Sequence, residues 1–372
     1  MIKEDNIDSF LIEKDYILSV HNNSVYNKVI KEYYKRLYEE SGIYLPEEKK
    51  SIGKRETLKS KLDSLDKCNK FWIMDVYNRS LIKDFVSTNL CKDKFCNNCK
   101  KVKQATRMSK YIPELEPYKN NLYHITFTIP NVKGEELRDT IKKMSKAFNR
   151  LFRYIKGLDK INGVDFSKYG YKGAVRSLEI TFNGNEYHPH YHCAFIFDNL
   201  DVSNRIYKNQ YSIDFTGSRE ERLFSEFEIL IQKLWYLCYN EEYINYKRIT
   251  TLAVGYSCLV EKFNDNDYAE LFKYMTKETD EKDNILTYEN FKTLYQSTFA
   301  LKQIQGYGCL YKITDKDLTE EVDKVYADII EFLSQENEKP VSRLEQPYDL
   351  LTDNNFKIIS RKKIYQYLNE KG

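Results

Sequence analysis

The sequence predicts an α+β fold in which helices pack on an antiparallel β-sheet. The first observation is a hairpin: residues 176–182 and 187–197 are rich in β-forming residues, and the NGNE tetrapeptide at 183–186 has the composition of a turn. The second is that segments in which every other residue is apolar, as in strands, are mixed along the chain with segments whose apolar residues have helical spacing. The third is a content of 41% hydrophobic and 15% aromatic residues over 372 residues, which is enough for a buried core.

The other elements follow from the same two patterns. Residues 23–40 predict a helix, and residues 121–129 predict a strand that Pro130 ends. Ser218 and Glu221 form a capping-box pattern that predicts a helix start. The remaining expected elements are a helix over 134–156, a strand over 248–260, a helix over 288–303 and a strand over 306–313.

Three of the five histidines alternate along the second hairpin strand, at positions 188, 190 and 192. Alternate residues of a strand share one face. Pairing centred on the turn sets Glu179 opposite His190, and a slip of two residues would set it opposite His188. Two imidazoles and a carboxylate can hold a divalent metal with open coordination positions. The alternative is a row of hydrogen-bonded histidines, which is also how we interpret His124, with a ligand or phosphate-contacting role as its alternative.

Four of the eight cysteines lie within residues 61–110. Cys91, Cys96 and Cys99 are separated by four and two residues, and Cys68 precedes them. Thiolates at this spacing can share one tetrahedral zinc ion, with Cys68 as the fourth ligand. The alternatives are free thiols or a redox pair.

Residues 91–110 are strongly basic, although the net charge of the whole chain is only +3. Seven lysines and arginines stand there against one aspartate. Such a segment is typical of a contact with a nucleic-acid backbone, and a solvated basic face is the alternative. The candidate contacts are Lys100, Lys101, Lys103 and Arg107.

The N-terminal residues lack the apolar core of a signal peptide, and no stretch reaches 18 apolar residues. We therefore expect a cytoplasmic protein without a membrane partner, in which the cysteines are reduced or bind metal.

Residues 267–278 (DYAELFKYMTKE) predict a helix whose polar face carries Glu270, Tyr274 and Lys277. A tyrosine beside a metal fits phosphodiester transfer, because the metal can polarise a phosphate oxygen while the hydroxyl attacks. The alternative is a helix cap formed by Asp267 and Glu270, with Tyr274 as a surface aromatic.

In this order, these motifs resemble those of HUH endonucleases, and more specifically the rolling-circle replication initiators of small Gram-positive-type plasmids. The resemblance spans about residues 68–318. It includes the cysteine knuckle, LYHITFTIPN at 122–131, HPHYH at 188–192, the Glu270–Tyr274–Lys277 pattern and GYGCLYK at 306–312. Two departures are mild: Tyr307 separates glycines that are usually adjacent, and lysines follow Cys99 where arginines are common.

The resemblance implies a role for each matching residue. His190 and His192 become ligands of Mg²⁺ or Mn²⁺ with Glu179 as the third, and His188 flanks them. Tyr274 becomes the nucleophile that nicks one strand at the double-strand origin and forms a 5′-phosphotyrosine. Glu270 activates water at termination, and Lys277 orients the scissile phosphate.

The resemblance also implies partners and the two central domains, a zinc knuckle over 61–110 and the nicking and joining domain of HUH endonuclease fold over 111–318. Outside the resemblance, the sequence predicts a helical arm over 1–60 and a helical extension over 319–372. Origin DNA, a host helicase and replication proteins are the expected partners, and the oligomeric state stays open. The competing interpretations are a related HUH transposase or relaxase, and a non-catalytic zinc-dependent DNA-binding protein that controls replication.

Overall fold

The computed structural model describes residues 14–41, 55–68, 71–76, 83–88, 90–208, 223–253, 255–256, 258–264, 267–268, 271–272, 286–312 and 356–360. The chain divides into two compact units, one formed by residues 1–109 and 316–372 and the other by residues 110–315. Among the described residues, no helix has the length and apolar character needed to cross a bilayer.

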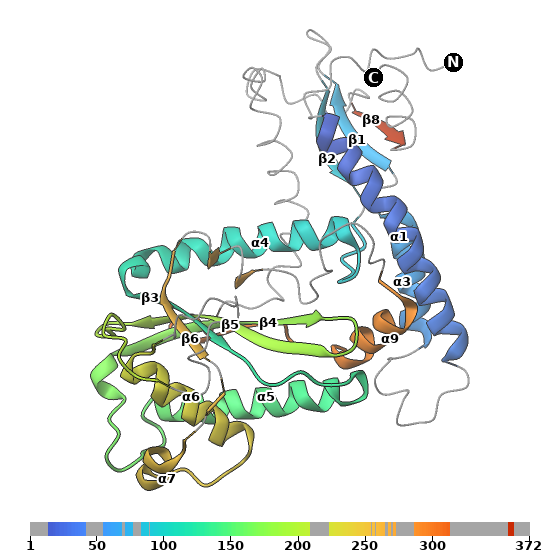
Figure 1. Cartoon of the computed structure of the whole chain (residues 1–372). Coiled ribbons are helices and arrows are strands. Elements are labelled where there is room, and N and C mark those ends of the chain that lie inside the picture. The colour runs from blue at the N-terminus through green and yellow to red at the C-terminus, as the bar shows by residue number, and fades with distance from the viewer. Residues whose placement is uncertain are drawn as a thin grey trace, which may run out of the picture. The chain divides into compact units, whose positions relative to one another are not determined.

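The first unit combines helices with a small sheet (Figure 1). Helix α1 (Lys14–Glu40) buries Ile30, Tyr34 and Leu37, which lie at helical spacing on one face. The other elements are α3 (Arg55–Lys67), β1 (Phe71–Val76), β2 (Lys83–Thr88), the start of α4 (Asn97–Leu115) and β8 (Phe356–Ser360).

The small sheet pairs strands from the N-terminal and C-terminal parts of the chain. Its strand order is β2-β1-β8, and both pairs are antiparallel. The expected extension over 319–372 was predicted to be helical, but its described residues form strand β8, which pairs with β1. Pairing with a neighbouring strand decided the conformation there, because β-structure depends on tertiary partners more than helix does.

The second unit is an antiparallel sheet of five strands in the order β6-β3-β5-β4-β7. This confirms the predicted α+β class. Its strands are β3 (Leu122–Phe127), β4 (Tyr171–Phe182), β5 (Tyr187–Phe197), β6 (Cys258–Lys262) and β7 (Ile304–Gly308). Its helices are η2 (Glu116–Asn121), α5 (Gly134–Ile155), η3 (Ser167–Tyr169), α6 (Glu226–Tyr239), α7 (Tyr246–Thr251) and α9 (Tyr288–Ser297).

Helices α5 and α6 cover one face of this sheet (Figure 1). The ring of Phe148 on α5 lies 5.5 Å from those of Phe127 and Tyr191, and Trp235 on α6 lies 5.3 Å from Phe127. Residues 187, 189, 191, 193, 195 and 197 of β5 are all buried. Since side chains alternate along a strand, packing of the odd-numbered residues under the helices leaves the even-numbered histidines on the opposite face.

Some boundaries differ from the expectation. Residues 248–260 were predicted as one strand, but Asn245 caps the short helix α7 by accepting from the Arg248 amide, and β6 begins only at Cys258. Helix α6 begins after Ser225, whose capping box uses Glu228, rather than at Ser218. Residues 218–221 lie outside the described residues.

The last strand of the five-stranded sheet, β7, ends at Gly308, whereas the predicted strand continued to residue 313. Gly308 adopts a φ of 61°, and a Cβ there would stand 2.2 Å from the Lys172 carbonyl oxygen. Glycine is therefore required where β7 passes close to β4.

Replacing the central aromatic ring of α5 tests this packing. We expect Phe148→Ala to lower the free energy of unfolding by about 3–5 kcal/mol, because it opens a cavity under the sheet. Chemical denaturation of the full chain measures the change. The neighbouring exposed residue supplies a control, since Asn149→Ala should change stability by less than about 0.5 kcal/mol. Equal effects of the two substitutions would contradict the proposed packing.

Candidate metal centres and nucleic-acid interface

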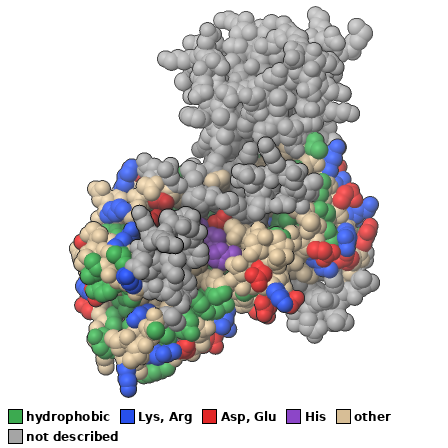
Figure 2. All heavy atoms as spheres, viewed as in Figure 1, with side chains coloured by type: hydrophobic (Ala, Val, Ile, Leu, Met, Phe, Trp, Pro, Cys, Tyr) green, Lys and Arg blue, Asp and Glu red, His purple; other side chains and the backbone are tan. Residues whose placement is uncertain are grey.

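The hairpin brings a carboxylate and two imidazoles together on the face opposite α5 and α6. Strands β4 and β5 pair with Glu179 opposite His190, which is the predicted register. Glu179 Oε2 lies 3.0 Å from His190 Nε2 and 2.8 Å from His192 Nε2. The two Nε2 atoms are 3.1 Å apart. Figure 2 shows histidine side chains reaching the molecular surface as one patch.

These three atoms fit a divalent cation. Ligands bound at about 2.1 Å and at right angles to one another are separated by roughly 3 Å, the edge of an octahedron around a Mg²⁺-sized ion. The observed separations of 2.8–3.1 Å match that edge. The residues Glu179, His190 and His192 thus form a group that could hold a metal ion, and the three ligands leave further coordination positions open.

The local electrostatics keep the carboxylate ionised. Burial alone would raise the pKa of Glu179, but when the imidazoles of His190 and His192 are protonated they donate to Glu179 and hold its pKa well below its usual range; when they are neutral, a bound cation would take that role. His188 lies on the same face but outside the group that could hold a metal. Its backbone carbonyl lies 3.2 Å from His190 Nδ1, and burial lowers the pKa of the His188 imidazole. His188 therefore flanks the site and holds the His190 ring.

Two residues that sequence reasoning did not place in the site stand directly behind it. His124 on β3 puts Nε2 3.0 Å from His192 Nδ1, and its own Nδ1 is 3.0 Å from Asp267 Oδ1. The only sequence signal was the period of β3, which gives His124 the same face as Thr126. The contact requires β3 to lie beside β5, a pairing between segments nearly 70 residues apart that a local pattern does not reveal.

The three expected residues of the nucleophile segment, Glu270, Tyr274 and Lys277, lie outside the described residues. The described neighbours Leu271 and Phe272 are fully buried, and the Phe272 ring stacks on Tyr111 at 5.2 Å. This packing holds the part of the segment that precedes Tyr274 against the second unit.

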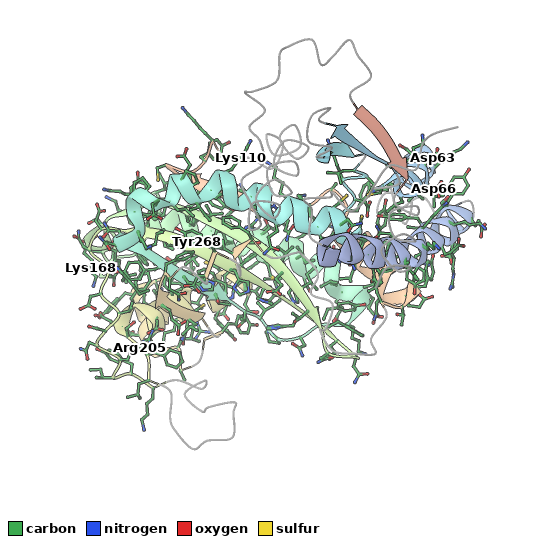
Figure 3. The ribbon with its side chains drawn as sticks, turned by 90° about the horizontal axis from the view of Figure 1, so that it is seen from above. Asp63, Asp66, Lys110, Lys168, Arg205 and Tyr268 are labelled. Atoms are coloured by element: carbon green, nitrogen blue, oxygen red, sulfur yellow. The ribbon has the colours of Figure 1, made fainter. Side chains whose placement is uncertain are left out.

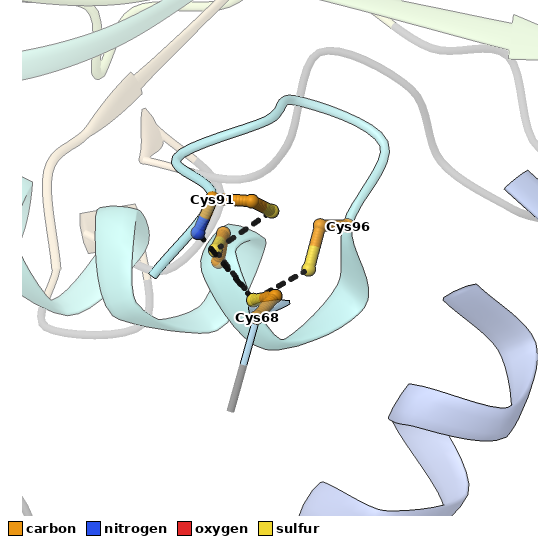
Figure 4. Close-up of side chains that lie close together, drawn as sticks. Cys68, Cys91 and Cys96 are labelled. Atoms are coloured by element: carbon orange, nitrogen blue, oxygen red, sulfur yellow. Dashed lines mark hydrogen bonds between the residues drawn. The ribbon is translucent and has the colours of Figure 1, made fainter. Parts of the chain in front are cut away.

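The four expected cysteines gather in the first unit (Figure 4). Cys68 Sγ lies 3.7 Å from the sulfurs of Cys96 and Cys99, and Cys91 Sγ lies 3.5 Å from that of Cys99. Sulfurs bound tetrahedrally at about 2.3 Å are separated by roughly 3.8 Å. The sulfur positions therefore match a tetrahedral metal site, and all four residues belong to one group that could hold an ion.

The four adjacent thiols influence one another's protonation. Hydrogen bonds from Cys91, Cys96 and Cys99 lower the pKa of the Cys68 thiol. Contacts within the cluster raise the pKa of Cys91 and Cys99 well above their usual values. A metal ion bound among the four sulfurs would stabilise several thiolates at once.

Helix α1 supplies the surroundings of the cysteine cluster. Asn27 Nδ2 donates to Cys96 Sγ at 2.9 Å, while its Oδ1 accepts from the Asn97 amide. The Tyr34 hydroxyl donates to Asp93, which also forms an ion pair with Lys61 of α3 and accepts from the Phe95 amide. The N-terminal helix α1, whose residue pattern predicted no chemical role, thus orients the knuckle.

The basic residues after the knuckle differ in exposure. Lys100 is 6% exposed and Arg107 is 1% exposed on helix α4. Lys103 is half-buried, and the side chain of Lys101 is not described. Their contact with a phosphate backbone stays a prediction.

Exposed cations also occur on the second unit. Arg205, labelled in Figure 3, keeps its guanidinium on the Val260 carbonyl at 2.6 Å and on Glu228 at 3.3 Å. Lys168 lies over the Tyr169 ring. These side chains are held by protein partners, so they give no separate sign of a nucleic-acid surface.

Comparisons with known proteins agree with the motifs. A family model described as "Replication protein" (Rep_1) matches residues 83–207, which include the hairpin and its three metal-ligand candidates. The protein rep of Staphylococcus aureus is 28% identical over 239 residues, covering 61% of this chain and 86% of that protein. The protein rep of Streptococcus pneumoniae is 31% identical over 150 residues, covering 38% of this chain and 42% of that protein.

A third relative, the protein rep of a Bacillus species, is 27% identical over 245 residues and covers 62% of this chain and 71% of that protein. No solved structure matches the chain significantly. The order of the motifs and these relatives agree: over residues 83–207 the chain is similar to the Rep_1 family of replication proteins, which supports a plasmid replication initiator.

Proposed function

We propose that this protein initiates rolling-circle replication of a plasmid by nicking one strand at the double-strand origin. The observation that carries the proposal is the convergence of Glu179, His190 and His192 within 3.1 Å of one another on one face of the sheet. The relatives named "Protein rep" support a role in replication. The expected ion is Mg²⁺ or Mn²⁺, which when bound would polarise a phosphate oxygen of the scissile bond.

Tyr274 is the proposed nucleophile. Its hydroxyl loses a proton and attacks the scissile phosphorus, a Tyr–O–P bond forms, and the P–O3′ bond breaks. The 3′ oxygen takes up a proton, which leaves a 3′-hydroxyl to prime synthesis and a 5′-phosphotyrosine on the protein. Lys277 would orient the phosphate, and Glu270 would later activate the water that hydrolyses the adduct at termination.

Chain geometry supports this assignment for Tyr274. Asp267 is bonded to His124, which in turn contacts the ligand candidate His192. Tyr274 follows Asp267 by seven residues, so a fully extended chain could carry it no farther than about 25 Å from that anchor. The metal centre is therefore within reach of Tyr274 along this length of chain.

The cysteine knuckle is proposed to hold a structural Zn²⁺ ion. A four-sulfur tetrahedral set without an open position suits zinc in a structural role rather than a catalytic one. Lys101 and Lys103, which follow the knuckle on α4, are the proposed contacts to the backbone of origin DNA. A host helicase and the replication machinery are the expected protein partners.

The nucleophile can be tested by trapping the covalent adduct. Incubation of the protein with a single-stranded oligonucleotide from its cognate origin and Mn²⁺ should give a protein–DNA band on a denaturing gel. Tyr274→Phe should abolish that band, because the ring without its hydroxyl cannot attack phosphorus. Tyr311→Phe, at an exposed tyrosine, serves as the matched control and should keep it. An adduct that persists in Tyr274→Phe would refute the assignment, and its absence from the unmodified protein would favour a non-catalytic DNA-binding role.

The role of Glu270 can be separated from that of Tyr274 by following the adduct over time. Glu270→Ala should form the adduct at a near-normal rate but hydrolyse it about 10²- to 10⁴-fold more slowly, the usual contribution of a general base. Quenched time courses measure both steps. Equal loss of formation and hydrolysis would point to a role of Glu270 in capping the helix instead.

Metal analysis tests the knuckle. The purified chain should contain about one zinc ion, which Cys96→Ser should remove, because a structural site needs all four sulfurs. The exposed Cys309 offers a matched control, and Cys309→Ser should retain the ion. Zinc is measured by elemental analysis, and stability by thermal unfolding. Full zinc content in Cys96→Ser would show that the cluster is a set of free thiols.

A further inference from the structure

The metal-ligand candidate His192 is held from behind by two residues, His124 and Asp267, for which the resemblance implies no role. His124 Nε2 lies 3.0 Å from His192 Nδ1, and the two ring planes are inclined by only 29°. Such an arrangement suits an in-plane N–H···N hydrogen bond between imidazoles. On the far side, His124 Nδ1 lies 3.0 Å from Asp267 Oδ1. The four groups thus form a continuous line from Asp267 through His124 and His192 to Glu179.

Hydrogen-bond chemistry determines which atom donates and which accepts at each step of this line. The ionised carboxylate of Asp267 only accepts, so His124 Nδ1 must carry the proton. The Nε2 atom of a neutral His124 then has a lone pair and must accept from His192, so the His192 proton lies on Nδ1. His192 consequently presents the lone pair of Nε2 to Glu179 Oε2, which is only 2.8 Å away.

That last contact brings two acceptors together and so favours a cation between them. A lone pair facing a carboxylate oxygen at this distance is repulsive unless a positive charge lies at the same point. We infer that Asp267 and His124 are positioning residues, which set the tautomer and ring orientation of His192 and so prepare the site for its divalent ion. This inference deepens the proposed function, on whose metal centre it rests.

The anchor of the line is itself well held. Asp267 Oδ2 accepts from the Asn264 amide at 2.7 Å, which leaves Oδ1 for His124. The side chains of His124 and Asp267 are only 11% and 13% exposed. The ring of Phe263 packs edge-on against both His124 and Tyr268, which Figure 3 labels. Water therefore has little access to the bond between the carboxylate and the imidazole.

His190 is oriented by a separate device. Its Nδ1 lies 3.2 Å from the carbonyl oxygen of His188, a backbone acceptor supplied by its own strand. Each imidazole thus uses Nδ1 as a donor and presents Nε2 to the site, and the acceptor is a backbone carbonyl for His190 but the side chain of His124 for His192. Asp267 also begins the segment that leads to Tyr274, so the same contact ties that segment to the metal centre.

Metal binding by the full chain tests the inference without measuring nicking. We expect His124→Phe, which keeps a flat ring but removes both nitrogens, to raise the Kd for Mn²⁺ about 10- to 100-fold, the usual effect of losing an outer partner of a ligating histidine. His124→Gln should recover most of the affinity, because its amide can accept from His192 and donate to Asp267. Calorimetry and the paramagnetic resonance of free Mn²⁺ both measure this Kd, on zinc-loaded protein.

Asp267→Asn tests the anchor with almost no change of shape. An amide has one acceptor oxygen where the carboxylate has two, so either the Asn264 amide or His124 loses its partner, and Mn²⁺ binding should weaken. Asp201→Asn is the matched control, since this exposed aspartate also accepts from a backbone amide, that of Ser203, but lies outside the line. It should bind Mn²⁺ as the unmodified chain does.

The outcomes separate the inference from the proposed function. Unchanged Mn²⁺ affinity in a folded His124→Phe, or equal weakening in His124→Gln and His124→Phe, would overturn the inference and leave the nicking proposal intact. If His124→Phe fails to fold, Asp267→Asn decides, and unchanged affinity there overturns the inference. A chain that binds Mn²⁺ as described but forms no adduct through Tyr274 would refute only the proposed function. Failure of the unmodified chain to bind Mn²⁺ would refute both the inference and the proposed function.

Discussion

The candidate metal centre depends on the antiparallel pairing of β4 with β5. The register that sets Glu179 opposite His190 places three ligand atoms within 3.1 Å of one another, the spacing of neighbouring ligands around one ion. A slip by one residue would turn the histidines toward α5 and bring Tyr191 to the site. The aromatic residues on the other face prevent such a slip, because Tyr191 and its neighbours are packed against Phe148 and Trp235. The hydrophobic core thus determines the geometry of a polar site.

The two metal-site candidates are built on different principles. The Glu179 site is formed by a regular hairpin, so its precision comes from the sheet and its open positions allow a substrate to bind. The cysteine cluster joins Cys68 at the end of α3 and Cys99 on α4 to a loop that carries Cys91 and Cys96. Its precision comes from hydrogen bonds that Asn27 of α1 makes to Cys96 and Lys61 of α3 makes to Asp93 of the loop. A structural site of this kind has a complete set of protein ligands and no open coordination position.

The hydrogen bond between His124 and Asp267 has two consequences for the candidate site. It holds His192 by its rear nitrogen, and it fixes to the same strands the segment that leads toward Tyr274. The orientation of His192 and the placement of the proposed nucleophile therefore depend on the same pair of contacts. Such a shared anchor would keep the distance between the metal ion and the attacking hydroxyl constant.

The sequence by itself determined the α+β class, the hairpin and its register, the stripe of α5 and the grouping of four cysteines, because each follows from spacing along a short stretch of chain. The tertiary structure alone decided that His124 stands behind His192, that Asn27 bonds Cys96, that Lys100 and Arg107 are buried, and that β8 pairs with β1. The physical reason is that these contacts join residues dozens to hundreds of positions apart. Local periodicity predicts the face on which a residue lies, whereas only the packing of whole elements decides which residue faces it.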